Sequence, residues 1–175
     1  KNKIFKEFNH SDVLLIPGFQ GINSKNEITT LGRGGSDTSA VAVAASLDAE
    51  CIIYTDVEGV FTTDPNLVKN AKKISQISYE EMLELASQGA KVLQTRSVEL
   101  AMRKKTKLSV RSSIKPNSSG TVVTEENSKL ENNTVSGIAY SKDEAKITLS
   151  RVLDKPGVSS KIFSPLAKGN INVDM

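Results

Sequence analysis

The sequence predicts an α/β protein built on a mainly parallel β-sheet with flanking helices. Two observations carry this prediction. Short apolar runs that suit buried strands alternate along the chain with longer segments of helical periodicity. Stretches rich in Gly, Pro, Asn and Ser separate these segments, as turns and loops do. With 175 residues, the chain is long enough for one domain of ordinary size and a small second module.

The N-terminal part of the chain predicts two strands, a hairpin and a helix. Residues 13–16 (VLLI) are a continuous apolar run that ends at a Pro-Gly pair, which indicates a strand buried on both faces. Residues 21–30 hold a polar break between two β-like pieces and predict a hairpin. The Ala-rich residues 39–47 predict a helix that packs closely on a sheet. Residues 51–54 (CIIY) predict a second buried strand.

The middle of the chain begins with an irregular loop over residues 56–65 (DVEGVFTTDP). Ser78 and Glu81 have the spacing of a capping box, which predicts the start of a helix that stops near Gly89. The next expected elements are a helix over residues 93–104 and strands over residues 108–110 and 121–123.

The C-terminal part starts with a polar stretch, residues 125–134, which we interpret as a linker. Alternation over residues 146–152 predicts a strand, and the DKPG sequence that follows predicts a tight turn. Residues 158–168 have helical periodicity, and residues 171–173 begin another predicted strand. This βαβ fragment is too small to close a core by itself.

Composition excludes several functional classes. The net charge is +3, from 23 basic and 20 acidic residues, and aromatic residues make up 5%, so a nucleic-acid partner is not expected. No apolar stretch is long enough to span a bilayer and the first residues carry no apolar core, so we expect a cytoplasmic protein without a membrane partner. With one His (His10, expected at the surface) and one Cys, no protein-held metal site is expected. We expect Cys51 to be a buried core thiol.

The stretch TTLGRGGSDTSAVAVAA (residues 29–45) is the strongest candidate for a binding site. Its glycines at 32, 34 and 35 allow positive φ and close approach of a ligand. Free N–H groups at the start of the following helix favour an anion, and Arg33 can hold a carboxylate through two parallel hydrogen bonds. The sequence therefore predicts an anion site, which we call the glycine elbow (residues 31–37).

Ser36 and Asp37 complete the elbow. Ser36 can add a hydroxyl donor to the anion site. Asp37 is open to two interpretations, because an acid beside an anion site needs a cation nearby. It is either the N-cap of the helix or an acid that orients an ammonium group or a lysine.

Other polar residues follow predicted strands and helices. Thr55 and Asp56 come directly after a strand, where they either make ordinary turn contacts or contact a nucleotide. Phe61 packs either against a base or in the core. Lys91 either neutralises phosphates or only complements a helix C-terminus. We interpret residues 103–107 (RKKTK) as a solvated basic helix end.

The motifs PGFQG, TTLGRGGSDTSA, YTDVEGVFTTDP and GAKVLQTRSVELA resemble aspartate kinases, in this order and at similar spacing. The terminal RVLDKPGVSSKIFSPLAKGNINVDM is similar to the start of their first regulatory ACT module. The resemblance implies an incomplete amino-acid kinase domain of carbamate kinase-like fold over residues 1–124 and a linker over residues 125–134. Residues 135–175 would be a partial ferredoxin-like βαβ ACT module.

The resemblance also implies roles for residues. The implied catalytic residues are Arg33 and Asp37, of which Asp37 would organise the catalytic centre. The implied aspartate-binding residues are Thr30, Arg33, Gly34, Gly35 and Ser36. The implied ATP-binding residues are Thr55, Asp56, Phe61, Lys91 and Val92. The implied effector-binding residues are Asp154, Pro156 and Gly157, which would contact lysine or threonine.

The implied reaction transfers a phosphoryl group from ATP to the β-carboxylate of L-aspartate and gives 4-phospho-L-aspartate, the first step of lysine, threonine and methionine biosynthesis. Mg²⁺ would be held mostly by phosphate oxygens and water. Two alternatives stay open. The chain is a regulatory module that binds lysine or threonine, or it belongs to a kinase of another amino acid such as glutamate. In the parent protein, the resemblance implies a homo-oligomer.

The sequence departs from the family pattern at several points. Asn66 stands where relatives commonly have an arginine, Phe61 where they often have tyrosine, and Gln94-Thr95 where they often have His-Pro. The family's K-F-G-G-T-S segment and its substrate-binding glutamate are absent from these residues. We therefore expect a chain that starts midway through the kinase domain, ends midway through the ACT module, and does not turn over aspartate by itself.

Overall fold

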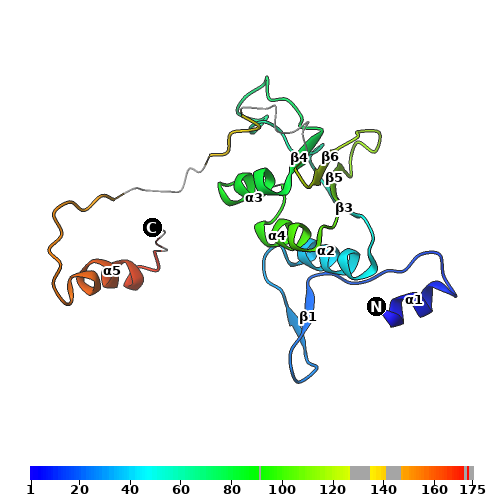
Figure 1. Cartoon of the computed structure of the whole chain (residues 1–175), viewed down its shortest axis with the longest axis horizontal. Helices are drawn as coiled ribbons and strands as arrows, with labels where there is room; N and C mark the ends of the chain where they lie inside the picture. The colour runs from blue at the N-terminus through cyan, green and yellow to red at the C-terminus, as the bar shows by residue number, and fades with distance from the viewer. Residues whose placement is uncertain (91, 127–134, 141–146, 172, 174–175) are drawn as a thin grey trace. The chain divides into compact units, whose positions relative to one another are not determined.

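The computed structural model describes residues 1–90, 92–126, 135–140, 147–171 and 173 (Figure 1). The chain divides into two compact units, Lys1–Ser141 and Lys142–Met175. Each unit is described by itself. In the described part of the chain, every helix is too short or too polar to cross a membrane.

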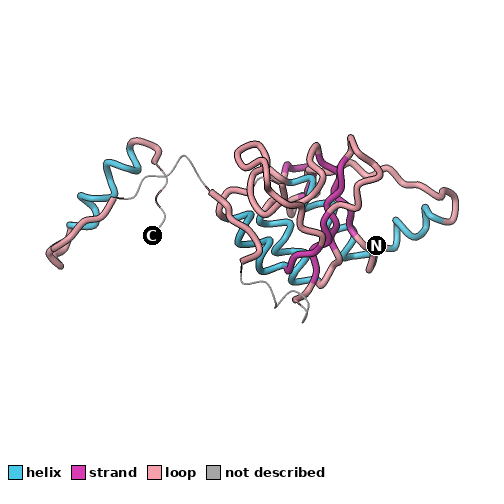
Figure 2. The backbone as a smooth tube through the Cα atoms, turned by 90° about the horizontal axis from the view of Figure 1, so that it is seen from above, coloured by secondary structure: helices cyan, strands magenta, loops and turns pink. Residues whose placement is uncertain are grey.

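The first unit is built on a four-stranded sheet in the order β3 (Cys51–Thr55), β5 (Leu108–Ser112), β6 (Thr121–Thr124) and β4 (Gln76–Ser78). β3 and β5 are parallel, as are β4 and β6, whereas β5 and β6 are antiparallel. The predicted mainly parallel sheet is confirmed. The antiparallel pair follows from the short connection between β5 and β6, which cannot form a parallel crossover. In Figure 2 the strands run close together with helices packed beside them.

Helices α2 (Gly35–Leu47), α4 (Thr95–Lys104) and α3 (Tyr79–Ser87) lie in a row beside the sheet (Figure 1). Each confirms a helix predicted from the sequence. α2 begins before the Ala-rich stretch, and α4 begins two residues later than predicted because Leu93 is buried in the turn before it. A further short helix, α1 (Asn2–Phe8), was not predicted.

The core lies between these helices and the sheet. Most of its side chains are small or branched and apolar, which suits close helix–sheet packing. Its buried members are Val41, Ala44, Cys51, Val60, Ile77, Tyr79, Met82, Leu85, Leu93, Val98, Ala101, Leu108, Val110 and Val123. Cys51 is buried in this core as predicted, and burial followed by the charge of Asp37 raises the pKa of its thiol to about 11. The thiol therefore stays protonated and unreactive at neutral pH.

Local sequence signals set several boundaries. The Ser78 hydroxyl accepts a bond from the Glu81 N–H at 3.1 Å, and the Glu81 carboxylate accepts one from the Ser78 N–H at 3.0 Å, so the predicted capping box is confirmed. The predicted hairpin is also confirmed as β1 (Gln20–Ile22) paired with β2 (Ile28–Thr30). The basic side chains of residues 103–107 are exposed, as predicted for a solvated helix end.

The strand predicted at residues 13–16 is wrong. Val13 and Leu15 are 82% and 98% exposed, and the segment is irregular. A strand needs a hydrogen-bonded neighbour as well as an apolar sequence. Among the described residues no strand pairs with this segment, although β3 forms an edge of the sheet.

Residues 135–140, which we call the strap, lie along α3 and the loop that follows β3. The Ser136 hydroxyl donates to the Glu81 carboxylate, and the Ile138 N–H donates to the Thr62 carbonyl at 2.7 Å. The Tyr140 hydroxyl donates to the Asp64 carboxylate at 3.2 Å. The strap therefore ties the first turn of α3 to the loop after β3.

The second unit contains α5 (Val158–Lys168), as predicted. The turn predicted at DKPG lies one residue later, over residues 155–158, where the Val158 N–H donates to the Lys155 carbonyl at 3.3 Å. The predicted strands are wrong for the described residues 147–152, 171 and 173, which form none. Residues 146 and 172 of those predictions, and residues 127–134 of the linker, lie outside the described residues. Period-two alternation cannot make a strand where the described part of the unit offers no pairing partner.

Candidate functional site

The candidate site lies at the edge of the sheet where β3 and β5 end. Their register places Thr55 beside Ser112, so the loops that follow both strands begin at the same edge. α2 leads directly into β3 and α4 leads directly into β5, each through a short turn, so both helices start at this edge as well. Strand ends and helix starts therefore converge where ligands bind in open α/β sheets.

The glycines of the elbow have two different roles. Gly32 and Gly34 have φ of +75° and +71°, so positive φ is confirmed at these positions. Gly35 does not have positive φ. A Cβ at Gly35 would lie 2.7 Å from the Leu31 Cβ, so this glycine is required by close packing. Gly34 also packs against the Gln94 side chain, where an added Cβ would overlap Cγ. The elbow is thereby pressed against the start of α4.

Arg33 and Ser36 are exposed at the surface of the elbow, and Gly34 is the N-cap of α2. Neither N-cap residue, Gly34 of α2 or Gln94 of α4, makes a side-chain cap hydrogen bond. The partial positive charge of two neighbouring helix starts, together with the Arg33 guanidinium, makes this part of the edge suited to an anion. An anion site at residues 31–37 stays a prediction. Thr30, at the end of β2, is exposed beside it.

Asp37 lies in the first turn of α2, and it is not the N-cap, so that interpretation is wrong. Its carboxylate accepts a hydrogen bond from the Gln94 N–H. Burial raises the pKa of Asp37, and the Gln94 bond opposes this rise. The partner of this acid in the described structure is thus a backbone N–H at the start of α4.

Arg96 is a site residue that the sequence reasoning missed. Its Nη2 donates to the Leu31 carbonyl at 3.0 Å and to the Arg33 carbonyl at 2.6 Å. The signal available in the sequence was a cation in the first turn of a helix, where the helix dipole disfavours positive charge.

The loop after β3 contains the predicted nucleotide-binding residues. The Thr55 hydroxyl donates to the Asp56 carboxylate at 3.0 Å, a contact that ordinary turn chemistry also makes. Phe61 is half-buried and pairs with Lys73 through an isolated bridge. Val92 is half-buried in the turn before α4. Lys91 lies outside the described residues.

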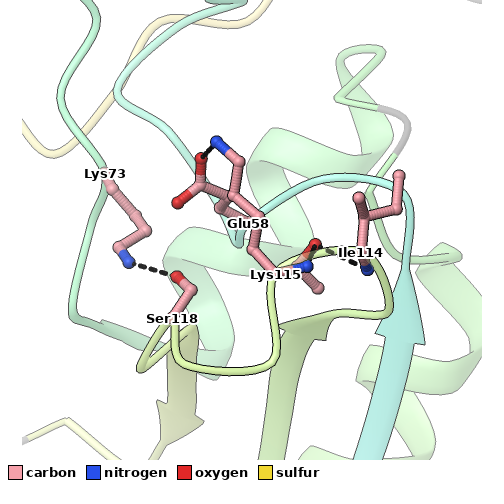
Figure 3. Close-up of polar contacts among 6 residues, drawn as sticks. Glu58, Lys73, Ile114, Lys115 and Ser118 are labelled. Carbon is pink, nitrogen blue, oxygen red and sulfur yellow. Dashed lines mark hydrogen bonds and ion pairs between the residues drawn. The ribbon is translucent and has the colours of Figure 1, made fainter.

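Two lysines at the same edge were also missed. Figure 3 shows Lys115 beside Glu58 and Lys73 beside Ser118, near the strand ends, with Nζ–O distances of 2.6 and 2.8 Å. The hydrogen bond from Lys115 and the charges of both lysines lower the pKa of the Glu58 carboxyl. Two cations therefore face one carboxylate, which leaves positive charge available beside the loop after β3.

The predicted effector residues Asp154, Pro156 and Gly157 lie in the second unit. Gly157 is the N-cap of α5 with φ of +88°, and an added Cβ there would meet nothing within 4 Å. These residues belong to a different unit from the elbow.

The edge thus offers two neighbouring regions that suit anions. One is the elbow with Arg33 and the helix starts of α2 and α4. The other is the loop after β3 with Lys73 and Lys115. Bringing two anions together is the central difficulty of transferring a phosphoryl group to a carboxylate, and separate countercharges reduce it.

Comparison with known sequences gives a consistent result. Residues 1–112 match the amino acid kinase family. An aspartate kinase of Pseudomonas putida is 49% identical over 174 residues, which are 99% of this chain and 42% of the relative. An aspartokinase of Helicobacter pylori is 52% identical over 167 residues, or 93% of this chain and 41% of the relative. The chain spans about 42% of the length of the curated relatives that it matches.

Solved structures of aspartate kinases share the fold. Aspartokinase III of E. coli in complex with lysine and aspartate (T-state) superposes with a TM-score of 0.66 at 33% identity, over 90% of this chain and 36% of that one. The same enzyme in complex with aspartate and ADP (R-state) gives 0.61 over the same shares. The aspartate kinase from Synechocystis gives 0.53 at 42% identity, over 85% and 27%. These similarities confirm the predicted α/β fold class.

Proposed function

The chain belongs to the amino acid kinase family, and from this premise we propose that it carries part of the active site of an aspartate kinase. The reaction is transfer of the terminal phosphoryl group of ATP to the β-carboxylate of L-aspartate, which gives 4-phospho-L-aspartate. The observation that carries the proposal is the LGRGGSD elbow, with Arg33 exposed beside the starts of α2 and α4. The proposal is supported by relatives with about 50% sequence identity that are named aspartate kinase or aspartokinase.

The amino-acid half of the site is the elbow. Arg33 forms the countercharge for a substrate carboxylate, and Ser36 adds a donor. Thr30 and the glycine backbone at positions 34 and 35 complete this subsite. The attacking group is already a carboxylate, so no strong general base is needed, and Asp37 contributes by organising the centre. Catalysis then comes from positioning and from neutralising charge.

The nucleotide half of the site is the loop after β3. Thr55, Asp56, Phe61 and Val92 line it, and Lys91 is included from the sequence motif. Asn66 stands where relatives commonly have an arginine. Its backbone N–H donates a hydrogen bond to the Asp64 carboxylate at 2.8 Å. Lys73 and Lys115 add positive charge near this loop. We propose that they partly compensate for the missing arginine.

Mg²⁺ fits this site as the partner of ATP. It prefers oxygen ligands and keeps several waters, usually with one or two carboxylates. Asp37 and Asp56 are the carboxylates that would hold it. When bound, the ion supplies neutralisation of phosphate charge.

The second unit, Lys142–Met175, is proposed to belong to the start of a regulatory ACT module. The sequence-based bounds are residues 1–124 for the kinase part, 125–134 for the linker and 135–175 for the module, and the structure differs from them in that the strap (residues 135–140) packs within the first unit. E. coli aspartokinase III in the T-state is in complex with lysine. By analogy, Asp154, Pro156 and Gly157 would contact lysine or threonine. We also propose a homo-oligomeric parent protein in the cytoplasm.

Calorimetry on the 175-residue chain tests the function. We expect heat from L-aspartate and from MgATP, and none from L-glutamate or N-acetylglutamate. A response to glutamate in place of aspartate would favour a kinase of another amino acid. Heat from lysine or threonine without any from aspartate would favour the regulatory module. In a coupled assay we expect no aspartate-dependent turnover by this chain alone, and turnover abolished by Arg33→Ala would contradict that expectation.

A further inference from the structure

The first turn of α4 is unusual for a helix start. It contains no acidic residue, and it contains Arg96. The N-terminus of a helix carries partial positive charge, so a cation there destabilises the helix. Arg96 is exposed, so it does not fill the core either. Neither helix stability nor packing explains this arginine.

The contacts of Arg96 lie on the glycine elbow. One nitrogen, Nη2, donates to both the Leu31 carbonyl (3.0 Å) and the Arg33 carbonyl (2.6 Å). Gly32 lies between these two residues in the chain and has a positive φ of +75°, a conformation that glycine adopts without strain. Arg96 therefore fixes the carbonyl groups of the residues before and after Gly32. Its helix is itself held in place by Val98 and Ala101, which are buried in the core.

The residues around Arg96 reinforce the same junction. The Gln94 N–H donates to the Asp37 carboxylate, and the Gln94 side chain packs on Gly34. The start of α4 thus holds the elbow at its entry, at its exit and at the first turn of α2. The Arg96 bonds fix the peptide unit from which the Arg33 side chain projects.

We infer that Arg96 is a positioning residue for the amino-acid subsite, which orients Arg33 toward the substrate carboxylate by holding the Leu31 and Arg33 carbonyls. This role rests on the proposed function. Hydrogen bonds from a charged donor are stronger than those from a neutral donor, and the planar guanidinium group can donate to two backbone carbonyls at once. Arg96 touches no reacting atom in this role, and its effect reaches the substrate through Arg33.

Arg96→Gln tests the role, and Arg103→Gln is the matched control. Arg103 lies in the last turn of the same helix and is exposed, so its replacement removes the same charge away from the elbow. Hydrogen exchange of the 175-residue chain is read at the Leu31 and Gly35 amides, which donate to Phe19 (3.0 Å) and Gly32 (2.9 Å). We expect about tenfold faster exchange at both amides in Arg96→Gln, and no change in the control.

The ligand measurement separates positioning from general destabilisation. By NMR titration, we expect L-aspartate to bind about tenfold more weakly to Arg96→Gln, whereas MgATP affinity stays within about twofold. Arg96→Lys, which keeps a donor, should recover part of the aspartate affinity, and it replaces Arg96→Gln if that variant does not fold.

Equal elbow exchange and equal aspartate affinity in Arg96→Gln and Arg103→Gln would overturn the inference. A parallel loss of aspartate and MgATP affinity would also overturn it, because that pattern indicates a structural role alone. If the unmodified chain does not bind aspartate, but the elbow amides still exchange faster in Arg96→Gln, the proposed function is wrong. The structural role of Arg96 in fixing the elbow backbone is then still supported.

Discussion

The elbow and the loop after β3 lie at the same edge of the sheet, yet they are held in different ways. The elbow is exposed, depends on positive φ at Gly32 and Gly34, and is fixed by side chains of α4. The loop after β3 is fixed by the sheet itself, because the buried Thr121 hydroxyl accepts from the Val60 N–H at 2.8 Å and donates to the Ile74 carbonyl at 2.5 Å.

This difference predicts that the two halves of the site respond differently to mutation. The nucleotide half is an extension of the core, so damage to it should cost stability. The amino-acid half is a surface feature held by a few contacts, so damage to it should cost ligand binding and little stability. The predictions below test this distinction, from the largest expected effect to the smallest.

Gly120→Ala should have the largest effect. Gly120 has φ of +72°, and an added Cβ would overlap the Val110 carbonyl oxygen, a backbone atom of β5 that cannot move aside. We expect a loss of about 3 kcal/mol or more in the free energy of unfolding, measured by denaturant titration. Gly32→Ala is the control, since its φ is similar (+75°) but nothing lies within 4 Å. Equal losses in both variants would contradict the proposed distinction.

Thr121→Val should destabilise the same half to a smaller degree. Thr121 is fully buried, and valine keeps its shape while it leaves the Val60 N–H and the Ile74 carbonyl without this partner. The expected cost is about 1–3 kcal/mol, with faster hydrogen exchange at Val60. Thr124→Val, in the same strand and only half-buried, should change stability by less than about 0.5 kcal/mol. A Thr121→Val chain as stable as the unmodified chain would show that the loop is held in another way.

Glu81 links the capping box to the strap and gives a pH-dependent test. Although burial acts to raise the pKa of Glu81, bonds from Ser136 and Ser78 outweigh it and lower the pKa. A lowered folded-state pKa contributes stability that is present above the unfolded pKa of about 4.3 and is lost as the pH falls through the folded pKa. Glu81→Gln should therefore cost roughly 1 kcal/mol at pH 7, because a carboxylate accepts stronger hydrogen bonds than an amide, and this difference should shrink below about pH 4.

Glu80→Gln serves as the control for this pH test, because Glu80 is the exposed neighbour in the same helical turn. Chemical unfolding of the three chains at several pH values gives the comparison. A Glu81→Gln deficit that is the same at pH 7 and at pH 3.5 would contradict the ionic origin of the contribution.

The elements that were predictable from sequence are those whose signals are local. The capping box at Ser78 and the small residues of α2 determine their structure within one or two turns. The hairpin is similar, because its strands are neighbours in the chain. β4 was missed, since a three-residue strand is defined by its pairing with β6 and not by its own sequence.

The errors share one physical cause. Residues 13–16 and 147–152 have strand-like sequences, but a strand exists only beside a partner. The same limit applies to the site. The types of residue in the elbow were visible, whereas the Arg96 bonds join residues 63 and 65 positions apart, and the Asp37–Gln94 contact is also distant in sequence. Lys73 and Lys115 are likewise brought together with the site only by the fold.

The central claim is that Arg33 in the elbow is the countercharge for an amino-acid carboxylate. NMR titration of L-aspartate into the unmodified chain, Arg33→Ala and Arg103→Ala tests it most directly. We predict saturable shifts at elbow residues in the unmodified chain and in Arg103→Ala, and a loss of affinity of at least about tenfold in Arg33→Ala, with MgATP binding unchanged. Equal aspartate affinity in all three chains, or no aspartate binding by any of them, would contradict the claim.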